Sequence, residues 1–99
     1  AILRLIEPSD HLVLLDERGK ESTSVEFAAW LSKRMAAGTK RLVFVIGGPY
    51  GLTNEVKQRA DFLWSLSKLT FTHEFARLIL LEQLFRASNI QMGGSYHND

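Results

Sequence analysis

The chain has 99 residues, of which 45% are hydrophobic and 23% are charged, and its formal net charge is +1 at pH 7. These values are typical of one globular domain, and the basic excess that usually marks a nucleic-acid-binding protein is missing. The absence of cysteine excludes a disulfide framework, a thiolate nucleophile and a cysteine-based metal site, and it fits a reducing cytoplasm.

The first ten residues, AILRLIEPSD, are expected to be the last turns of a helix that ends at Pro8, because proline disfavours a helical conformation in the residue before it. The chain starts at Ala1 and not at a methionine, so we expect it to be the C-terminal part of a longer chain. Removal of an initiator methionine before a short helix is the alternative.

The next segments predict a strand, a helix and a second strand. The apolar run HLVLLD at residues 11–16 predicts a buried strand that ends in a carboxylate. Thr23 and Glu26 form a Thr-x-x-Glu capping box, which predicts a helix that begins there and ends at Gly38. The run RLVFVIGG at residues 41–48 predicts the second buried strand.

The second half of the chain continues the alternation. Thr53 is expected to cap a helix that runs to about Ala60, and WSLSKLTF at residues 64–71 has strand character. The last helix is predicted from about His73 to about Ile90, followed by a glycine-rich tail. Strands that alternate with helices in this way predict a single α/β domain around a parallel sheet. No apolar run approaches the ~20 residues of a membrane span, so no membrane partner is expected.

Ligands of parallel α/β sheets bind beyond the carboxyl ends of the strands. Residues 15–19, 47–51 and 67–73 follow the three predicted strands, or end them, and so can converge on one crevice. The hydroxyl groups of Ser67, Thr70 and Thr72 are either hydrogen-bond donors to a ligand there or ordinary solvated loop groups.

The segment GGPYG at residues 47–51 allows two interpretations. It is neither a Gly-x-Gly-x-x-Gly motif nor a P-loop, and Pro49 removes one backbone N–H that a phosphate-binding loop would use. It is either a plain tight turn or a place where Gly47 and Gly48 let the backbone approach a flat ligand.

The last helix has two polar regions on an otherwise apolar surface. Glu82, Gln83, Arg86 and Asn89 are expected to form one solvated arc at helical spacing. His73 and Arg77 lie on the apolar side, where the arginine either packs through its stem or forms a cationic site beside a histidine that can transfer protons. The helix is apolar nearly all round, so we expect a second subunit to bury the part of its surface that the domain itself leaves exposed. The histidines His11, His73 and His97 lack HExxH-type spacing, and no metal site is predicted.

Four segments together resemble a known family: HLVLLDERGKE, FVIGGPYGL, LWSLSKLTFTHEFARLILLEQLFRA and the terminal YH. They are similar to the SPOUT-superfamily methyltransferases that act on N3 of a pseudouridine in large-subunit (23S) ribosomal RNA, the RlmH type. The resemblance spans residues 9–97. Family members carry a further strand, helix and strand on the N-terminal side, so residues 1–99 are expected to be a single SPOUT domain, the C-terminal two-thirds of a longer chain.

The resemblance implies a Rossmann-like parallel sheet with helices on both faces and a C-terminal trefoil knot. It implies S-adenosylmethionine as cofactor, a homodimer whose interface includes the last helix, and a cytoplasmic enzyme that methylates ribosomal RNA. Because phosphate neutralisation supplies most non-specific affinity for RNA, the near-neutral charge favours a folded ribosomal particle over free RNA as substrate.

The resemblance also assigns roles to individual residues. The cofactor-binding residues that it implies are Leu15, Gly47, Gly48, Gly51, Ser67, Lys68, Leu69, Thr70, Phe71 and Thr72. The catalytic, RNA-facing residues that it implies are His73, Arg77, Tyr96 and His97. Among these, His73, or else His97, is expected to help remove the N3 proton. Tyr50, Thr72 and the terminal Asn98 and Asp99 differ from the residues common at these positions in the family.

Two other functions stay open at this point. The chain could be a non-catalytic dimeric fragment that binds cofactor without turnover. It could also be a Rossmann-like domain that binds nucleotides or other phosphate ligands in preference to S-adenosylmethionine.

Overall fold

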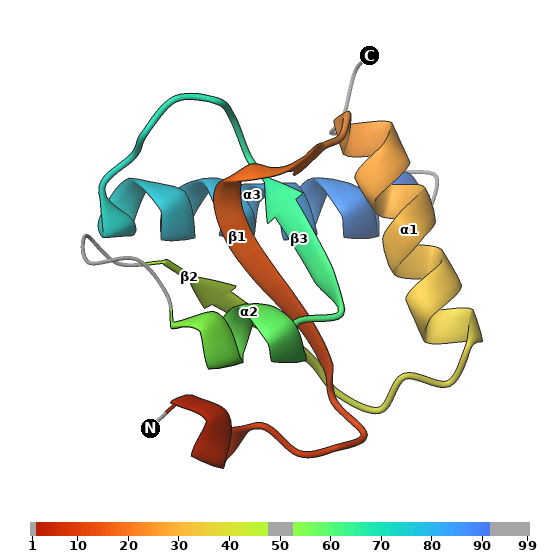
Figure 1. The fold of residues 1–99 in the computed structure, drawn as a ribbon. Helices are drawn as coiled ribbons and strands as arrows, with labels where there is room; N and C mark the ends of the chain where they lie inside the picture. The colour runs from red at the N-terminus through yellow and green to blue at the C-terminus, as the bar shows by residue number, and fades with distance from the viewer. Residues whose placement is uncertain (1, 48–52, 92–99) are drawn as a thin grey trace.

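The computed structural model describes residues 2–47 and 53–91, and these form alternating strands and helices (Figure 1). The elements in chain order are η1 (Ile2–Leu5), β1 (His11–Glu21), α1 (Ser24–Ala36), β2 (Leu42–Ile46), α2 (Asn54–Arg59), β3 (Phe62–Ser65) and α3 (His73–Gln91). None of the helices in this part of the chain is long and apolar enough to cross a membrane. The predicted α/β class is confirmed.

The sheet has three parallel strands in the order β2-β1-β3, with β1 in the centre. β1 aligns with β2 from His11–Leu42 to Leu15–Ile46, and it aligns with β3 beginning at Val13–Phe62. In the ribbon view α3 crosses behind the sheet and α2 lies in front of it (Figure 1). Helices therefore lie on both faces, and the carboxyl ends of all three strands meet at one end of the sheet.

The larger part of the core lies between the sheet, α1 and α3. Val13 and Leu15 of β1 pack there with Phe27, Trp64 and Leu80, all of them buried. The rings of Phe27 and Trp64 stack with centroids 4.2 Å apart. Because successive side chains of a strand point to opposite faces, the fully buried Leu12 and Leu14 belong to the other face, where α2 contributes the buried Val56.

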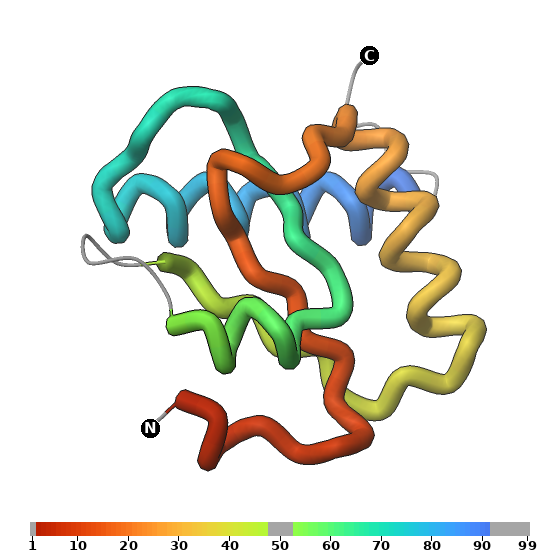
Figure 2. Tube along the Cα trace, viewed as in Figure 1, coloured from red at the N-terminus to blue at the C-terminus, as the bar shows by residue number. Residues whose placement is uncertain are grey.

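β1 is longer than predicted because it continues across the end of β3 (Figure 2). The register between the two strands shifts there, since Leu15 and Lys20 both align with Trp64. A Cβ atom at Gly19 would lie 2.7 Å from the carbonyl carbon and oxygen of Leu63 and 2.8 Å from the nitrogen of Trp64. Only glycine fits this close approach of two backbones.

The predicted helix starts are confirmed. Thr23 is the N-cap of α1, and its side chain accepts a hydrogen bond from the N–H of Glu26, whose carboxylate accepts one from the N–H of Thr23. α1 ends at Ala36, and Gly38 follows with a φ of +82°, which glycine adopts without strain. Thr53 caps α2 through the N–H of Val56.

Two strand predictions need correction. β3 ends at Ser65, and residues 66–71 are not in the sheet. Local hydrogen bonds replace the sheet pairing there. Ser65 Oγ donates to the carbonyl of Ser67 (2.9 Å), and Ser67 Oγ accepts from the N–H of Leu69 (3.0 Å). β2 was expected to be buried, yet all five residues are only half-buried, since β2 is an edge strand.

The predicted solvated arc of the last helix is also wrong for three of its four residues. Gln83, Arg86 and Asn89 are half-buried, and only Glu82 is exposed. α3 packs against α1 on this side, where Ser24 Oγ donates to Gln83 Oε1 over 2.5 Å. The exposed side of α3 is instead apolar.

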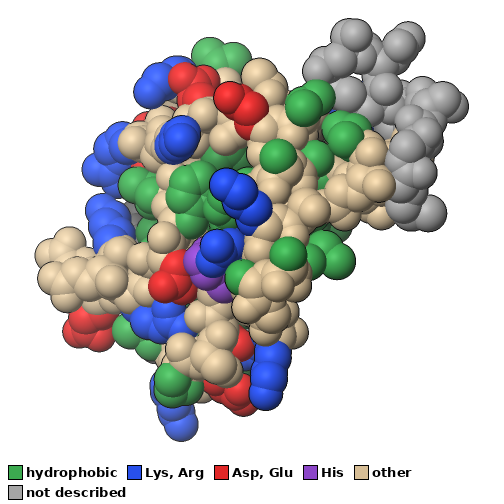
Figure 3. All heavy atoms as spheres, turned by 90° about the vertical axis from the view of Figure 1, so that its right-hand side faces the viewer, with side chains coloured by type: hydrophobic (Ala, Val, Ile, Leu, Met, Phe, Trp, Pro, Cys, Tyr) green, Lys and Arg blue, Asp and Glu red, His purple; other side chains and the backbone are tan. Residues whose placement is uncertain are grey.

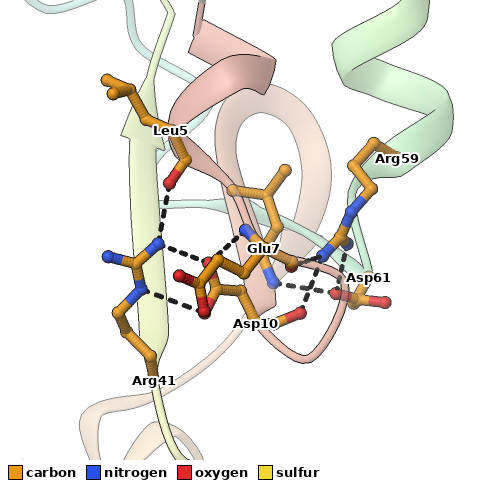
Figure 4. A network of polar contacts seen from close by, with 7 residues as sticks. Leu5, Glu7, Asp10, Arg41, Arg59 and Asp61 are labelled. Carbon is orange, nitrogen blue, oxygen red and sulfur yellow. Dashed lines mark hydrogen bonds and ion pairs between the residues drawn. The ribbon is translucent and has the colours of Figure 1, made fainter.

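A network of charged side chains closes the amino end of the sheet (Figure 4). Arg41 Nε and Nη2 donate to the two carboxylate oxygens of Asp10 over 3.0 and 2.6 Å, and the N–H of Glu7 donates to the same carboxylate over 2.7 Å. These contacts, with the Arg41 side chain first, hold the pKa of Asp10 below its usual range. Asp10 is buried, so the pair fixes the chain that enters β1.

Arg59 and Asp61 extend this network to the end of α2. Arg59 Nη2 donates to the backbone carbonyls of Glu7 and Asp10, and Arg59 Nη1 donates to Asp61 over 3.0 Å. Asp61 also accepts a 2.8 Å hydrogen bond from the N–H of Leu12, and its own N–H donates to the carbonyl of Leu12. The amino end of the sheet is therefore tied to backbone groups on both sides.

Candidate functional site

A cavity of about 640 Å³ lies at the carboxyl end of the sheet. Its walls come from residues 15–18 of β1, from residues 46–47 at the end of β2, and from residues 66–76, which lead from β3 into α3. The predicted convergence of three strand ends is therefore confirmed for the described residues. The expected cofactor residues that line the cavity are Leu15, Gly47, Ser67, Leu69, Thr70, Phe71 and Thr72.

The other expected site residues are placed differently. Gly48, Gly51, Tyr96 and His97 lie outside the described residues. Lys68 is not part of the cavity wall, and its ammonium group lies 3.9 Å from a carboxylate oxygen of Glu21. Arg77 is exposed one helical turn after His73 and does not line the cavity either.

The hydroxyl groups of the 66–72 loop shape the loop itself. Ser67 Oγ accepts from the N–H of Leu69, and Thr72 Oγ1 accepts from the N–H of Phe75 (3.3 Å) and so caps α3. Each of these two hydroxyls uses acceptor capacity in these bonds and keeps its hydrogen for another partner. Ser67 and Thr72 therefore combine a structural role with the ability to donate to a ligand in the cavity.

Thr70 connects two sides of the cavity. Its hydroxyl donates to Oε2 of Glu17 over 2.8 Å, so the 66–72 loop is joined to the irregular part of β1. Both residues line the cavity. This hydrogen bond spans 53 positions in the sequence and fixes the distance between two walls.

His73 stands where α3 begins and lies close to the end of β2. Its Nε2 is 3.0 Å from the carbonyl oxygen of Ile46. A carbonyl oxygen can only accept, so Nε2 carries the hydrogen of this bond, and in the neutral ring Nδ1 keeps its lone pair. The exposed imidazole can therefore accept a proton at Nδ1 while Nε2 anchors it to the sheet.

The sequence placed residues 15–19 at this crevice without giving Asp16, Glu17 or Arg18 a role, and it did not predict Glu74 there; all four line the cavity. Arg18 donates from Nε and Nη2 to the two oxygens of Asp16 over 3.0 and 2.9 Å. The Arg18 side chain is the main reason that the pKa of Asp16 is lowered to about 2. The run of charged residues at 16–18, directly after an apolar strand, was the sequence feature that could have predicted polar groups at this site.

The described residues contain no group of three or more histidine, cysteine, aspartate or glutamate side chains that could hold a metal ion. A parallel sheet with helices on both faces and a cavity at its carboxyl end is typical of α/β domains that bind a small organic ligand. Residues 1–97 match the family described as "predicted SPOUT methyltransferase", and the chain belongs to this family.

Three relatives of this chain share one name, ribosomal RNA large subunit methyltransferase H. The chain is 50% identical to the protein of Bacteroides fragilis and 51% identical to that of Bacteroides thetaiotaomicron over 98 residues, and 52% identical to that of Christiangramia forsetii over 97 residues. These alignments cover 98–99% of the chain, which spans about 62% of the length of each relative. The family resemblance noted in the sequence is thereby confirmed.

Proposed function

We propose that this chain forms the cofactor-binding and catalytic domain of a methyltransferase that uses S-adenosylmethionine to methylate N3 of a pseudouridine in large-subunit ribosomal RNA. The observation that carries the proposal is the cavity, because seven of the ten cofactor residues implied by the resemblance line it. The relatives' name supports the RNA substrate. The proposal includes the trefoil knot of the superfamily and, with a ribosomal substrate, a cytoplasmic location.

The cavity suits the proposed cofactor in size and chemistry. Its volume lies within the ~300–1,000 Å³ that is usual for small-molecule sites. Leu15, Ile46 and Phe71 offer apolar surface to a flat ring, while Ser67 and Thr72 can donate hydrogen bonds. When bound, S-adenosylmethionine supplies a methyl group that its sulfonium already activates, so the protein has to align the reactants and remove a proton.

His73 is the proposed proton acceptor for the N3–H of the target base. Its Nδ1 is available because Nε2 donates to Ile46, and it stands at the wall of the cavity. Arg77 follows one turn later on α3 and would hold an RNA phosphate or the anion that develops on the base. Tyr96 and His97 are proposed to contribute from the tail, on the strength of the resemblance alone.

The proposed homodimer forms through the exposed side of α3. Four large apolar side chains there, Phe75, Leu78, Leu81 and Phe85, are between 55% and 61% exposed. They lie opposite the buried Ala76, Leu80 and Ala87 and form one stripe along the helix. An exposed apolar stripe of this kind is best covered by the same stripe of a second copy.

Sedimentation velocity tests the dimer. The unmodified chain should sediment as a dimer, and the double variant Leu78→Glu/Leu81→Glu should sediment as a folded monomer. Leu5→Glu is the matched control, because Leu5 is 73% exposed on η1, outside the stripe, and this variant should remain dimeric. A monomeric unmodified chain would contradict the proposed interface.

The proposed substrate is a folded ribosomal particle. On the face that carries α1, basic and acidic side chains of the described residues are interspersed, and among these residues the basic groups form no continuous patch (Figure 3). Together with the net charge of +1, this predicts weak affinity for free RNA and leaves recognition to the shape of the particle.

The proposed function is tested by cofactor binding and methyl transfer together. Calorimetry should show one site per chain for S-adenosylhomocysteine, and labelled methyl groups should pass from S-adenosylmethionine to large-subunit particles. Gly47→Val adds a side chain to the cavity wall and should abolish both activities, while Ala36→Val, at the exposed end of α1, should abolish neither. Binding without transfer would indicate the non-catalytic alternative, and preference for a nucleotide would indicate the phosphate-binding alternative.

A further inference from the structure

The charges on the cavity wall are unbalanced. Asp16, Glu17 and Glu74 line the cavity, and Arg18 is the only lysine or arginine among the described residues that line it. Arg18 is hydrogen-bonded to both oxygens of Asp16, so these two charges largely cancel. The negative charges of Glu17 and Glu74 are left to act on whatever occupies the cavity.

Of these two carboxylates, Glu17 has the better-defined position. Its Oε2 accepts the 2.8 Å hydrogen bond from the hydroxyl of Thr70, and this bond connects two walls of the cavity. Glu17 also lies in the segment where β1 shifts register against β3, next to the tight contact at Gly19. Its carboxylate is therefore held by tertiary structure and keeps acceptor capacity on both oxygens.

We propose that Glu17 is a specificity-determining residue that makes the cavity prefer a cationic sulfonium ligand to the corresponding neutral thioether. This inference rests on the proposed function. In methyl transfer the bond between the methyl carbon and sulfur breaks and its electron pair stays on sulfur, while the methyl group bonds to N3 and the N3 proton passes to a base. The ligand thus loses one positive charge, and a fixed carboxylate nearby attracts the substrate more strongly than the product. Glu17 would hold S-adenosylmethionine and favour the release of S-adenosylhomocysteine.

The test compares the affinities of the 99-residue chain for the two ligands by calorimetry. Glu17→Gln removes the charge but keeps the length of the side chain and an oxygen that can accept from Thr70. We expect the affinity for S-adenosylmethionine to fall about three- to tenfold and that for S-adenosylhomocysteine to stay the same. Added salt should reduce the preference of the unmodified chain and should have little effect on the variant.

Glu55→Gln is the matched control, because Glu55 is exposed on α2, outside the cavity wall and away from α3, and this variant should keep the preference. An equal loss of affinity for both ligands in Glu17→Gln would show a purely structural role and overturn the inference, as would no change for either. If the folded, unmodified chain binds neither ligand, the proposed cofactor site fails as well. If it binds both and Glu17→Gln leaves their ratio unchanged, only the role of Glu17 fails.

Discussion

The two ends of the parallel sheet are built in opposite ways. At the amino end, Asp10, Arg41, Arg59 and Asp61 bond to one another and to backbone groups, which leaves little for a ligand to contact. At the carboxyl end, loops surround an open cavity, and the hydrogen bond between Thr70 and Glu17 joins two of its walls. From this difference we expect stability to be concentrated at the amino end and the proposed ligand to bind at the carboxyl end.

Substitution of Gly19 should reduce stability the most, because this residue lies in tight backbone contact with β3 beside the cavity at the carboxyl end. Gly19→Ala would place a Cβ 2.7 Å from the Leu63 backbone, and we expect it to lower the free energy of unfolding by about 3 kcal/mol. Gly38→Ala is the control: its Cβ would meet nothing within 4 Å, so only the φ of +82° is unfavourable, at about 1–2 kcal/mol. Urea unfolding measures both, and equal losses would contradict the close approach of the two backbones.

A change at the carboxyl end should affect activity far more than stability. His73→Ala removes the proposed proton acceptor, and we expect the rate of methyl transfer to fall about 100-fold. The melting temperature should change little, because the exposed ring contributes the one hydrogen bond to Ile46. Single-turnover kinetics with large-subunit particles measures the rate, and an unchanged rate would exclude His73 as an essential base.

A change at the amino end should do the opposite. Asp10→Ala removes the acceptor of two Arg41 hydrogen bonds and one from Glu7, so the melting temperature should fall by several degrees. The affinity for S-adenosylhomocysteine at a temperature where the variant is folded should not change. A loss of affinity in the folded variant would show that the two ends are coupled.

Asp16 gives the smallest expected effect and a characteristic pH dependence. Its pKa is lowered from 3.8 to about 2 in the folded chain, so the ion pair with Arg18 stabilises the fold above about pH 4 and is lost as the pH falls toward 2. Because Arg18 is 67% exposed, solvent screening limits the effect of Asp16→Asn at neutral pH to about 0.5–1 kcal/mol. Unfolding curves of the variant and the unmodified chain should converge near pH 2. A constant difference down to pH 2 would exclude titration of Asp16 as the cause.

The sequence predicted the features that depend on local signals. The apolar run of β1, the capping box at Thr23 and the cap at Thr53 each place an element correctly. The convergence of three strand ends followed from parallel topology alone. The half-burial of β2 could not be predicted in this way, because it depends on the strand's place at the edge of the sheet.

The rest of the site depends on contacts between distant segments. The register shift at Gly19 arises where β1 crosses β3, and the Thr70–Glu17 bond joins residues 53 positions apart. Neither leaves a periodic signal in the sequence. Lys68, which the family resemblance places among the cofactor-binding residues, lies outside the cavity wall, with its ammonium group 3.9 Å from a carboxylate oxygen of Glu21.

The central position of β1 has a consequence for the order of folding. β1 is the first strand in the described chain, yet its partners β2 and β3 begin about 30 and about 50 residues after it. Among the described strands, β1 can pair with β2 only after residue 46 has been synthesised, and its edge that faces β3 gains its partner from this part of the chain only at residue 65. Refolding should accordingly be slower than that of a helical protein of the same length, and the interval before β3 is complete is when the chain is most prone to aggregate.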